Sequence, residues 1–422
     1  MMGGQVIGSV PNPGGSRDLH VWRDRLGNRH TELRTTPRRR EPSVDRIVGS
    51  LEASWTDTVD VEARAREALA RPNPFIEPDP SDPESTLWTW TFQDPEARSV
   101  MLWTNPVFDH SDVARMELAR LPGSDLWTIC LRMPASLRAS YRISVWHQDE
   151  EPPWRAASGR RPVIRAATRA SVIDPRGADI VHGSRGEASS VAAGPLAPTE
   201  LWRGLEPAVG SRVDEVALPG DERAWVYSPG RDTATPLLVL YDGQVWRKLG
   251  LSSILDAMIG AGQIPPLHVA MLDSGDQNHR REALGVPGRQ VDTVIDALLP
   301  RVRSGWDVAP DGAATLVSGQ SLGGIASLWT VALSGGQVQH AIAQSASLWR
   351  FDVAEALLKE PAWRSIELHA GTYEGDMLSD ARTLAATLSA SGRSVTCHGF
   401  EAGHDWAVWR ANLIRALCRW SG

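Results

Sequence analysis

The stretch Ala-Thr-Leu-Val-Ser-Gly-Gln-Ser-Leu-Gly-Gly-Ile-Ala, residues 314–326, predicts a strand, a sharp turn and the start of a helix. Residues 319–323 match the G-x-S-x-G pattern of a nucleophile elbow. An apolar run precedes the turn at 315–317 and another follows it at 325–333, which is the setting this motif requires. The turn is strained, so a Cβ at Gly319 or Gly323 would collide with neighbouring backbone. Ser321 is therefore predicted to stand in the open as a nucleophile.

A serine nucleophile also needs N–H groups that stabilise the oxyanion formed when it attacks a carbonyl group. The Leu322 N–H lies at the predicted helix start, where it suits this role. A second donor is expected from an early loop that follows a strand, and residues 240–246 offer the N–H groups of Gly243 and Gln244. The alternative is that the Asp-Gly pair in this loop is simply a turn.

A serine hydroxyl is a poor nucleophile near neutral pH, so Ser321 needs a general base. His404 lies in Glu-Ala-Gly-His-Asp-Trp, residues 401–406, between the last predicted strand and the last predicted helix. A loop in this place brings a histidine back to the elbow, as in the serine, acid, histidine order of hydrolases. A helix-capping or buried histidine is the competing interpretation.

The acid that orients the histidine is expected in the loop after the preceding strand. Residues 371–376 supply two candidates, Glu374 and Asp376. Either carboxylate could hold the imidazole tautomer. A helix begins directly after Asp376, so this residue is also a candidate N-cap, which favours Glu374 as the acid.

Length and composition indicate a globular protein of more than one domain. The chain has 422 residues, of which 42% are hydrophobic and 23% charged, and this length exceeds what one core usually supports. Its formal net charge of −7 argues against a nucleic-acid binder. The three cysteines are far apart and favour a reducing compartment. No apolar run is long enough to span a bilayer, and the start lacks the pattern of a signal peptide, so we expect a cytoplasmic protein.

The pattern of the first half predicts a leader, a sandwich domain and a linker. Residues 1–42 are rich in Gly, Pro and Arg without apolar periodicity and are predicted to be a disordered leader. Short helices are expected within 43–69. Five strand-like runs, at 87–92, 99–104, 114–121, 126–133 and 140–146, have the spacing of an immunoglobulin-like β-sandwich. Residues 150–205 are predicted to be an extended connection. The unit that follows the leader, made of the short helices, the sandwich and this linker, is therefore expected to span residues 43–205.

From about residue 206 to the end, strands and helices alternate. Strands are predicted at 223–228, 236–241, 268–272, 314–319, 339–344, 365–370 and 394–399, with helices between them and a last helix at 405–419. This alternation predicts an α/β domain with a parallel sheet covered on both faces, and a ligand site at the carboxyl ends of the strands.

Several separated motifs together resemble the enterochelin (enterobactin) esterases, which cleave ferric catecholate siderophores. They are Gly-Gln-Ser-Leu-Gly-Gly at 319–324, Gln-Ser-Ala-Ser-Leu-Trp at 344–349, Asp-Gly-Gln-Val-Trp at 242–246, Gly-His-Asp at 403–405 and Trp-Arg at 409–410. Residues 123–127, 140–141 and 173–175 are similar to the family's N-terminal sandwich and linker. The resemblance covers most of the chain from about residue 48. It implies an α/β-hydrolase domain with Ser321 as nucleophile, His404 as base and Glu374 at the position of the acid.

The resemblance also implies where the substrate binds. Arg280, in the segment 273–284, matches an arginine that the family places near its substrate, whereas Ala283 stands where the family usually has Glu. A ferric tris-catecholate is a trianion, so a guanidinium in the cleft would attract it and stack on catechol rings. Trp246 and Trp349 are further candidate substrate contacts.

These observations predict a serine esterase that hydrolyses the trilactone backbone of a catecholate siderophore such as enterobactin. Its partner is then a small-molecule ester, with no nucleic acid or membrane involved, no cofactor and no metal site, and iron present only as part of the substrate. An esterase of another macrolactone or natural-product ester is the first alternative. A non-catalytic siderophore-binding protein that keeps a relic elbow is the second.

Overall fold

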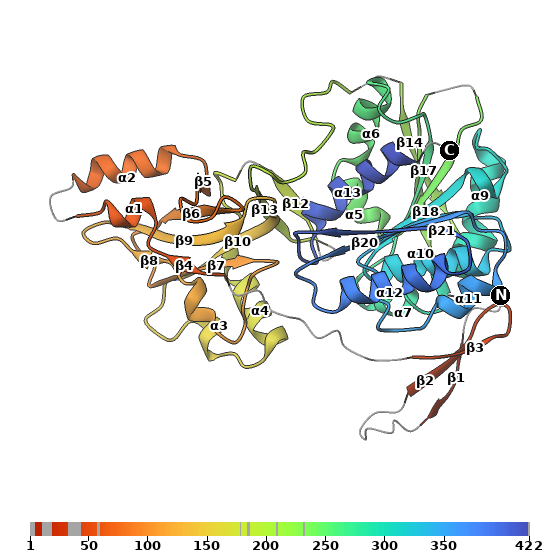
Figure 1. Ribbon diagram of the computed structural model, residues 1–422, viewed down its shortest axis with the longest axis horizontal. Helices are drawn as coiled ribbons and strands as arrows, with labels where there is room; N and C mark the ends of the chain where they lie inside the picture. The colour runs from red at the N-terminus through yellow and green to blue at the C-terminus, as the bar shows by residue number, and fades with distance from the viewer. Residues whose placement is uncertain are drawn as a thin grey trace.

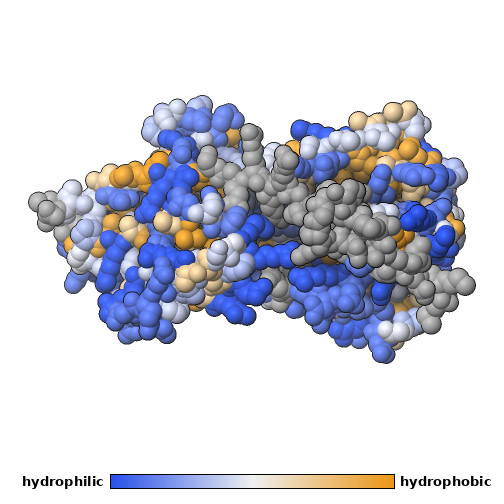
Figure 2. Space-filling view, turned by 90° about the horizontal axis from the view of Figure 1, so that it is seen from below, coloured by the Kyte–Doolittle hydropathy of each residue, from blue (hydrophilic) through white to orange (hydrophobic). Residues whose placement is uncertain are grey.

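The computed structural model describes residues 5–10, 19–32, 44–56, 60–177, 179–183, 186–207, 210–230, 233–287 and 289–420. Two lobes lie side by side along the long axis of the molecule (Figure 1). The first is a β-sandwich with short helices around it, and the second is a large sheet between two layers of helices. The face seen in Figure 2 is mostly hydrophilic, with apolar residues in scattered patches.

The sandwich consists of two sheets that share one apolar core. In one sheet the order is β4-β9-β6-β5 with β8 beside β9, and in the other it is β11-β10-β13-β12 with β7 beside β10. Trp88, Trp90 and Tyr141 are almost fully buried between them. The strands are β4 (Arg46–Ile47), β5 (Phe75–Pro78), β6 (Ser85–Gln93), β7 (Ser99–Thr104), β8 (Ala119–Arg120), β9 (Leu126–Pro134), β10 (Arg138–Trp146), β11 (Ser171–Val172), β12 (Ile180–His182) and β13 (Ala188–Ala193).

Two predictions for this lobe are wrong. Residues 150–205 are not an extended connection, because they contain α3 (Pro153–Ala156), α4 (Arg160–Arg169) and three strands of the second sheet. The small residues of this segment have little intrinsic preference for a strand. β13, for example, is Ala-Ser-Ser-Val-Ala-Ala and forms a strand through its pairing with β10. Residues 114–121 form a 3-10 turn at Val113–Met116 followed by the two-residue strand β8. The expected helices near the start are α1 (Ser50–Ala53) and α2 (Val61–Ala70).

The second lobe contains an eight-stranded sheet in the order β14-β15-β17-β16-β18-β19-β20-β21. β15 pairs antiparallel with β14 and β17, and every later pairing is parallel. β16 is Leu-Leu-Val-Leu and wholly buried, as expected for a strand covered on both faces. The strands are β14 (Arg212–Ala217), β15 (Arg223–Ser228), β16 (Leu237–Leu240), β17 (His268–Leu272), β18 (Thr315–Gln320), β19 (His340–Gln344), β20 (Ser365–Gly371) and β21 (Ser394–Phe400).

Helices cover both faces of this sheet, so the predicted α/β architecture is confirmed. Residues of α5 (Gly243–Lys248), α6 (Leu251–Gly260) and α13 (Trp406–Arg419) form one apolar core with the sheet. On the other face lie α8 (Arg289–Thr293), a π-helical turn at Val294–Leu298, α9 (Leu299–Gly305), α10 (Leu322–Leu333), α11 (Ala354–Lys359) and α12 (Met377–Ser389). The short α7 (Gln277–Ala283) follows β17.

The prediction of a disordered leader is wrong for the described part of residues 1–42. A three-stranded sheet forms from β1 (Gln5–Val10), β2 (Leu19–Arg23) and β3 (Arg29–Thr31), and it lies beside the α/β lobe (Figure 1). Trp22 packs into the core of that lobe, and Arg25 pairs with Asp296 at 2.6 Å. One buried tryptophan and a few ion pairs attach this segment to the α/β lobe. A contact this small produces no periodic apolar pattern in the sequence, so it could not be predicted. Residues 1–4, 11–18 and 33–42 lie outside the described part of the chain.

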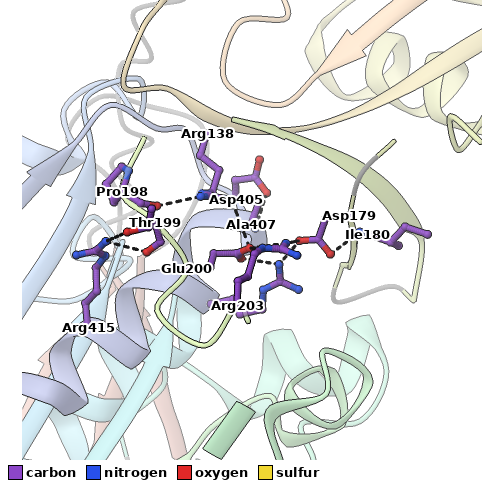
Figure 3. Close-up of polar contacts among 11 residues, drawn as sticks. Arg138, Asp179, Ile180, Pro198, Thr199, Glu200, Arg203, Asp405, Ala407 and Arg415 are labelled. Atoms are coloured by element: carbon purple, nitrogen blue, oxygen red, sulfur yellow. Dashed lines mark hydrogen bonds and ion pairs between the residues drawn. The ribbon is translucent and has the colours of Figure 1, made fainter. Parts of the chain in front are cut away.

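A partly buried network of charges joins the end of the sandwich lobe to α13 (Figure 3). Glu200, whose side chain is fully buried, accepts hydrogen bonds from Arg203 and Arg410 at 2.6 Å each. Asp179 accepts from the same two guanidinium groups, and Arg138 lies 3.7 Å from Glu200. Two carboxylates thus share three arginines, which satisfies charges that would otherwise be costly to bury.

Candidate active site

The elbow has the strained geometry that its sequence predicts. Ser321 joins β18 to α10 with φ of 60° and ψ of −118°, in a region that residues with side chains rarely adopt. A Cβ on Gly319 would lie 2.3 Å from the carbonyl oxygen of Gly323, so glycine is required there. The Ser321 N–H donates to the Gln344 carbonyl at 2.9 Å, and the Ser347 N–H donates to the Ser321 carbonyl at 3.0 Å. Hydrogen bonds to the loop after β19 therefore hold the strained residue.

His404 and Glu374 come together from two loops at the carboxyl edge of the sheet. The Nδ1 atom of His404 lies 3.3 Å from Oε1 of Glu374, whose side chain is 1% exposed. The Ser345 hydroxyl donates to the same oxygen at 2.9 Å, and the indole N–H of Trp409 donates to Ser345 Oγ at 2.9 Å. The Trp409 ring also meets the imidazole edge to face, with centroids 4.7 Å apart. Position and orientation of the acid are thus fixed by a chain of donors.

The structure distinguishes the two acids that the sequence offered. Asp376 is the N-cap residue of α12, but its side chain accepts no hydrogen bond from the helix N–H groups. The expectation that its carboxylate caps this helix is therefore wrong, because the backbone of Asp376 is already in a helical conformation with φ of −73° and ψ of −7°. The structure places Glu374 against the imidazole, which agrees with the preference for Glu374.

The sandwich lobe holds the loop that carries His404. Asn105 Nδ2 donates to the His404 carbonyl at 2.8 Å. Asp405 is 2% exposed and accepts from the Ser140 N–H at 2.6 Å and from the Ala407 N–H of α13 at 3.0 Å. Its burial raises the pKa of the Asp405 carboxyl, although the two N–H groups oppose this effect. Asn105 directly follows β7 and Ser140 lies in β10, so the position of the base depends on contacts with the other lobe.

A cavity of about 390 Å³ lies between the lobes, and both Ser321 and His404 line it. Arg280, Trp406 and Trp409 line it from the α/β lobe. The opposite wall comes from the sandwich lobe, through side chains of β7, β10 and α4. A substrate in this cavity would touch both lobes at once.

Arg280 lines the cavity, but it is not the partly exposed cation that the sequence suggested. The residue is 8% exposed, and its Nε and Nη2 atoms donate to the two carboxylate oxygens of Asp242 at 2.6 and 2.8 Å. Burial opposes the charged form, but the nearby carboxylate outweighs it and raises the pKa of the guanidinium. Asp242 also accepts from Gln320 Nε2 at 2.6 Å. The charge of Arg280 is therefore largely compensated beneath the elbow.

The remaining predicted residues occupy different places. Trp246 is fully buried and packs against Trp406 with ring centroids 5.4 Å apart, so its assignment as a substrate contact is wrong. Trp246 lies with Val245 on the side of α5 that is buried in the core. Trp349 is half-buried and is not part of the cavity wall, and its role stays a prediction.

The candidate oxyanion donors lie where the motif predicts them. Leu322 is the first residue of α10, and Gly243 is the first of α5. A Cβ on Gly243 would lie 2.4 Å from the backbone of Met271, so this helix start approaches β17 closely. The Gln244 side chain turns to the neighbouring loop, where its Oε1 accepts from the Ser274 N–H at 3.1 Å. The roles of these three N–H groups stay predictions.

Sequence reasoning missed the partners that surround the triad. Ser345 and Trp409 belong to motifs that carry the family resemblance, but nothing in their spacing shows that one donates to the other. Asn105 gave no signal, and Asp242 stood out only as part of a motif and a possible turn, because each acts through a contact with a residue distant in the sequence. Among the residues that the structure describes, no group of three His, Cys, Asp or Glu side chains is placed to hold a metal ion.

Comparisons with known proteins agree with this arrangement of two lobes. A family model for the N-terminal domain of enterochelin esterase matches residues 82–203, and an esterase family model matches residues 217–420. The chain is 29% identical to the iron(III) salmochelin esterase of Escherichia coli O6:H1, over 83% of this chain and 91% of that protein. It is 27% identical to the iron(III) enterobactin esterase of Dickeya dadantii, over 79% of this chain and 86% of the relative.

Solved structures share the same fold. The enterobactin esterase of Shigella flexneri, crystallised in the presence of enterobactin, superposes with a TM-score of 0.73 at 23% identity, over 86% of this chain and 98% of that one. The ferric enterobactin esterase of Salmonella typhimurium gives a TM-score of 0.73 at 24% identity, over 84% and 98%. With both family models matched in order and the elbow, histidine and acid in place, this chain belongs to the enterochelin esterase family of carboxylic-ester hydrolases.

Proposed function

We propose that this protein is a serine esterase that hydrolyses the trilactone backbone of a catecholate siderophore such as enterobactin or its relatives. The observation that carries the proposal is that His404, which contacts the buried Glu374, lines the same cavity as Ser321. The names of the relatives, which are enterobactin and salmochelin esterases, supply the substrate class.

The geometry supports a two-step mechanism. Ser321 Oγ attacks an ester carbonyl carbon while its proton passes to His404, and Glu374 stabilises the imidazolium that forms. N–H groups at the starts of α10 and α5 receive the charge on the carbonyl oxygen. The C–O ester bond then breaks, and His404 returns the proton to the departing alkoxide oxygen. Water attacks the acyl-enzyme with His404 again as the base, which releases the acid product and regenerates the Ser321 hydroxyl.

No resident cofactor or metal takes part in this scheme, and iron enters only with the substrate. A cytoplasmic location is part of the proposal, and the three free cysteines Cys130, Cys397 and Cys418 support a reducing compartment. None of the helices in the described ranges has the length and apolar character of a membrane span.

The test is a chromatographic product profile from ferric and iron-free trilactones. The wild type is expected to release linear oligomers or monomers, whereas Ser321→Ala and His404→Ala should each lower kcat by roughly 10³-fold or more. A fluorophosphonate probe should label the wild type and leave Ser321→Ala unlabelled. If the wild type is labelled but leaves both trilactones intact, the protein is an esterase of a different natural-product ester. If neither labelling nor turnover occurs, the protein is a binding protein.

A further inference from the structure

The wall of the cavity opposite Ser321 is one face of α4. Arg160, Ile164 and Thr168 are spaced four residues apart, so they lie along the same side of the helix, and all three line the cavity. Val163 and Ala167 lie on the adjoining side and are buried in the sandwich core. The packing of these two apolar residues therefore fixes which face of α4 looks toward the elbow.

This wall carries positive charge that the surroundings do not fully compensate. Arg169 is exposed, lines the cavity at the end of α4 and forms no ion pair with any residue that the structure describes. Arg142 of β10 also lines the cavity, and it donates to the Ser171 hydroxyl at 2.5 Å and to backbone carbonyls rather than to a carboxylate. With Arg160, the sandwich side of the cavity lining contains three arginines and one acidic side chain, that of Glu187.

The α/β lobe, by contrast, offers the cavity little net charge. Arg280 is bound through two hydrogen bonds to Asp242, and Asp405 is buried against N–H groups. The positive charges that would attract an anionic substrate therefore lie on the wall that the sandwich lobe provides. Ile164 and Trp103 lie on the same wall and provide apolar surface beside the arginines, which suits the flat rings of catechols.

We propose that Arg160 and Arg169 of α4 select the anionic ferric form of the substrate over the neutral iron-free form. This inference rests on the proposed function. Three neutral catechols lose two protons each when they bind Fe³⁺, which leaves a complex of charge −3, whereas the free catechols are neutral near pH 7. Two cations in the lining of the cavity attract only the first of these forms.

The experiment compares two double variants of the same helix. Arg160→Gln/Arg169→Gln removes the two cavity charges. Arg161→Gln/Arg165→Gln removes the same charge from two exposed positions of α4 that do not line the cavity. For the wild type and both variants, KM and kcat are measured with ferric and iron-free trilactone at low and high salt. Dissociation constants are measured by tryptophan fluorescence in a Ser321→Ala background, and circular dichroism melting curves report folding.

We expect Arg160→Gln/Arg169→Gln to raise KM and the dissociation constant for the ferric trilactone by roughly tenfold or more. Its ratio of ferric to iron-free KM should rise, and its salt dependence should be weaker than that of the wild type. The control variant should behave like the wild type. Equal changes in both variants, or an unchanged KM ratio in a folded cavity variant, would overturn this inference while wild-type turnover still supports the proposed function. A wild type that cleaves neither trilactone would overturn both.

Discussion

Glu374 Oε1 lies 3.3 Å from His404 Nδ1, and the same oxygen accepts a hydrogen bond from Ser345. The buried acid is thus held on one side by a hydroxyl and presented on the other to the imidazole. A carboxylate so placed selects the tautomer of His404 whose other nitrogen is free to take the serine proton.

Glu374→Gln should lower kcat by roughly 10²-fold or more, because an amide at this position no longer stabilises the imidazolium. Asp376→Asn is the matched control: it removes the charge of the other acid in the same loop, so it should leave kcat within about twofold in a variant that still folds. Steady-state kinetics measure kcat, and urea unfolding checks that each variant folds. Small and equal effects on kcat would show that serine and histidine work without an acid.

Trp409→Phe tests whether the donor chain positions the acid. The variant keeps an aromatic ring at the imidazole but loses the N–H that donates to Ser345 Oγ. We expect kcat to fall by roughly fivefold to tenfold while KM changes little, because the lost hydrogen bond affects the orientation of Glu374 rather than substrate contact. If Trp409→Phe has the same effect in a Glu374→Gln background, the residue does not act through the acid.

The contact between Arg280 and Asp242 predicts a strong energetic coupling. Arg280→Met leaves a buried carboxylate unpaired and should lower the free energy of unfolding by about 3–5 kcal/mol. Asp242→Asn replaces the carboxylate with a neutral amide. Asparagine, like aspartate, tolerates the left-handed backbone at this position, where φ is 59°. The double variant should be more stable than the sum of the single effects by about 2 kcal/mol, as measured by denaturant unfolding. Additive losses would mean that the pair contributes no specific stabilisation.

Glu367 and His369 predict a loss of stability in acid. Burial opposes ionisation of Glu367, but hydrogen bonds from His369 and Arg419 outweigh it and lower its pKa to about 2 from an ordinary 4.5. Burial also lowers the pKa of His369 from its ordinary 6.5. Both groups bind protons more weakly in the folded state, so the free energy of unfolding should fall as the pH falls below about 6.5.

Glu367→Gln isolates the carboxylate part of this effect. The wild type should lose about 3 kcal/mol more than the variant as the pH falls from 4.5 to 2, because only the wild type has this carboxylate to protonate. Urea midpoints recorded across this pH range provide the measurement. Parallel curves for the two proteins would contradict the assignment of the low pKa to Glu367.

The sequence predicted best where a pattern is local. The strand before Ser321, the helix after it and the alternation of the second lobe follow from short apolar runs, and the sheet confirms them. Prediction failed where a residue depends on a distant partner. β13 is a strand because β10 lies beside it, and Trp22 is buried because the α/β lobe offers a surface for it. Arg280 carried the signal of a substrate cation, but its buried partner Asp242 lies 38 positions earlier in the chain.

The hydrogen bonds from Asn105 to the His404 carbonyl and from Ser140 to Asp405 make the position of the base depend on a lobe that is synthesised earlier. The sandwich lobe leaves the ribosome first, and N-terminal domains generally fold as units while the remainder is still being made. The loop that carries the base, and the helix α13 behind it, are the last elements of the described chain to emerge. Ser321 is synthesised 83 residues before His404 and has no positioned base during that interval, so a truncated chain that ends before residue 404 carries the nucleophile but cannot activate it.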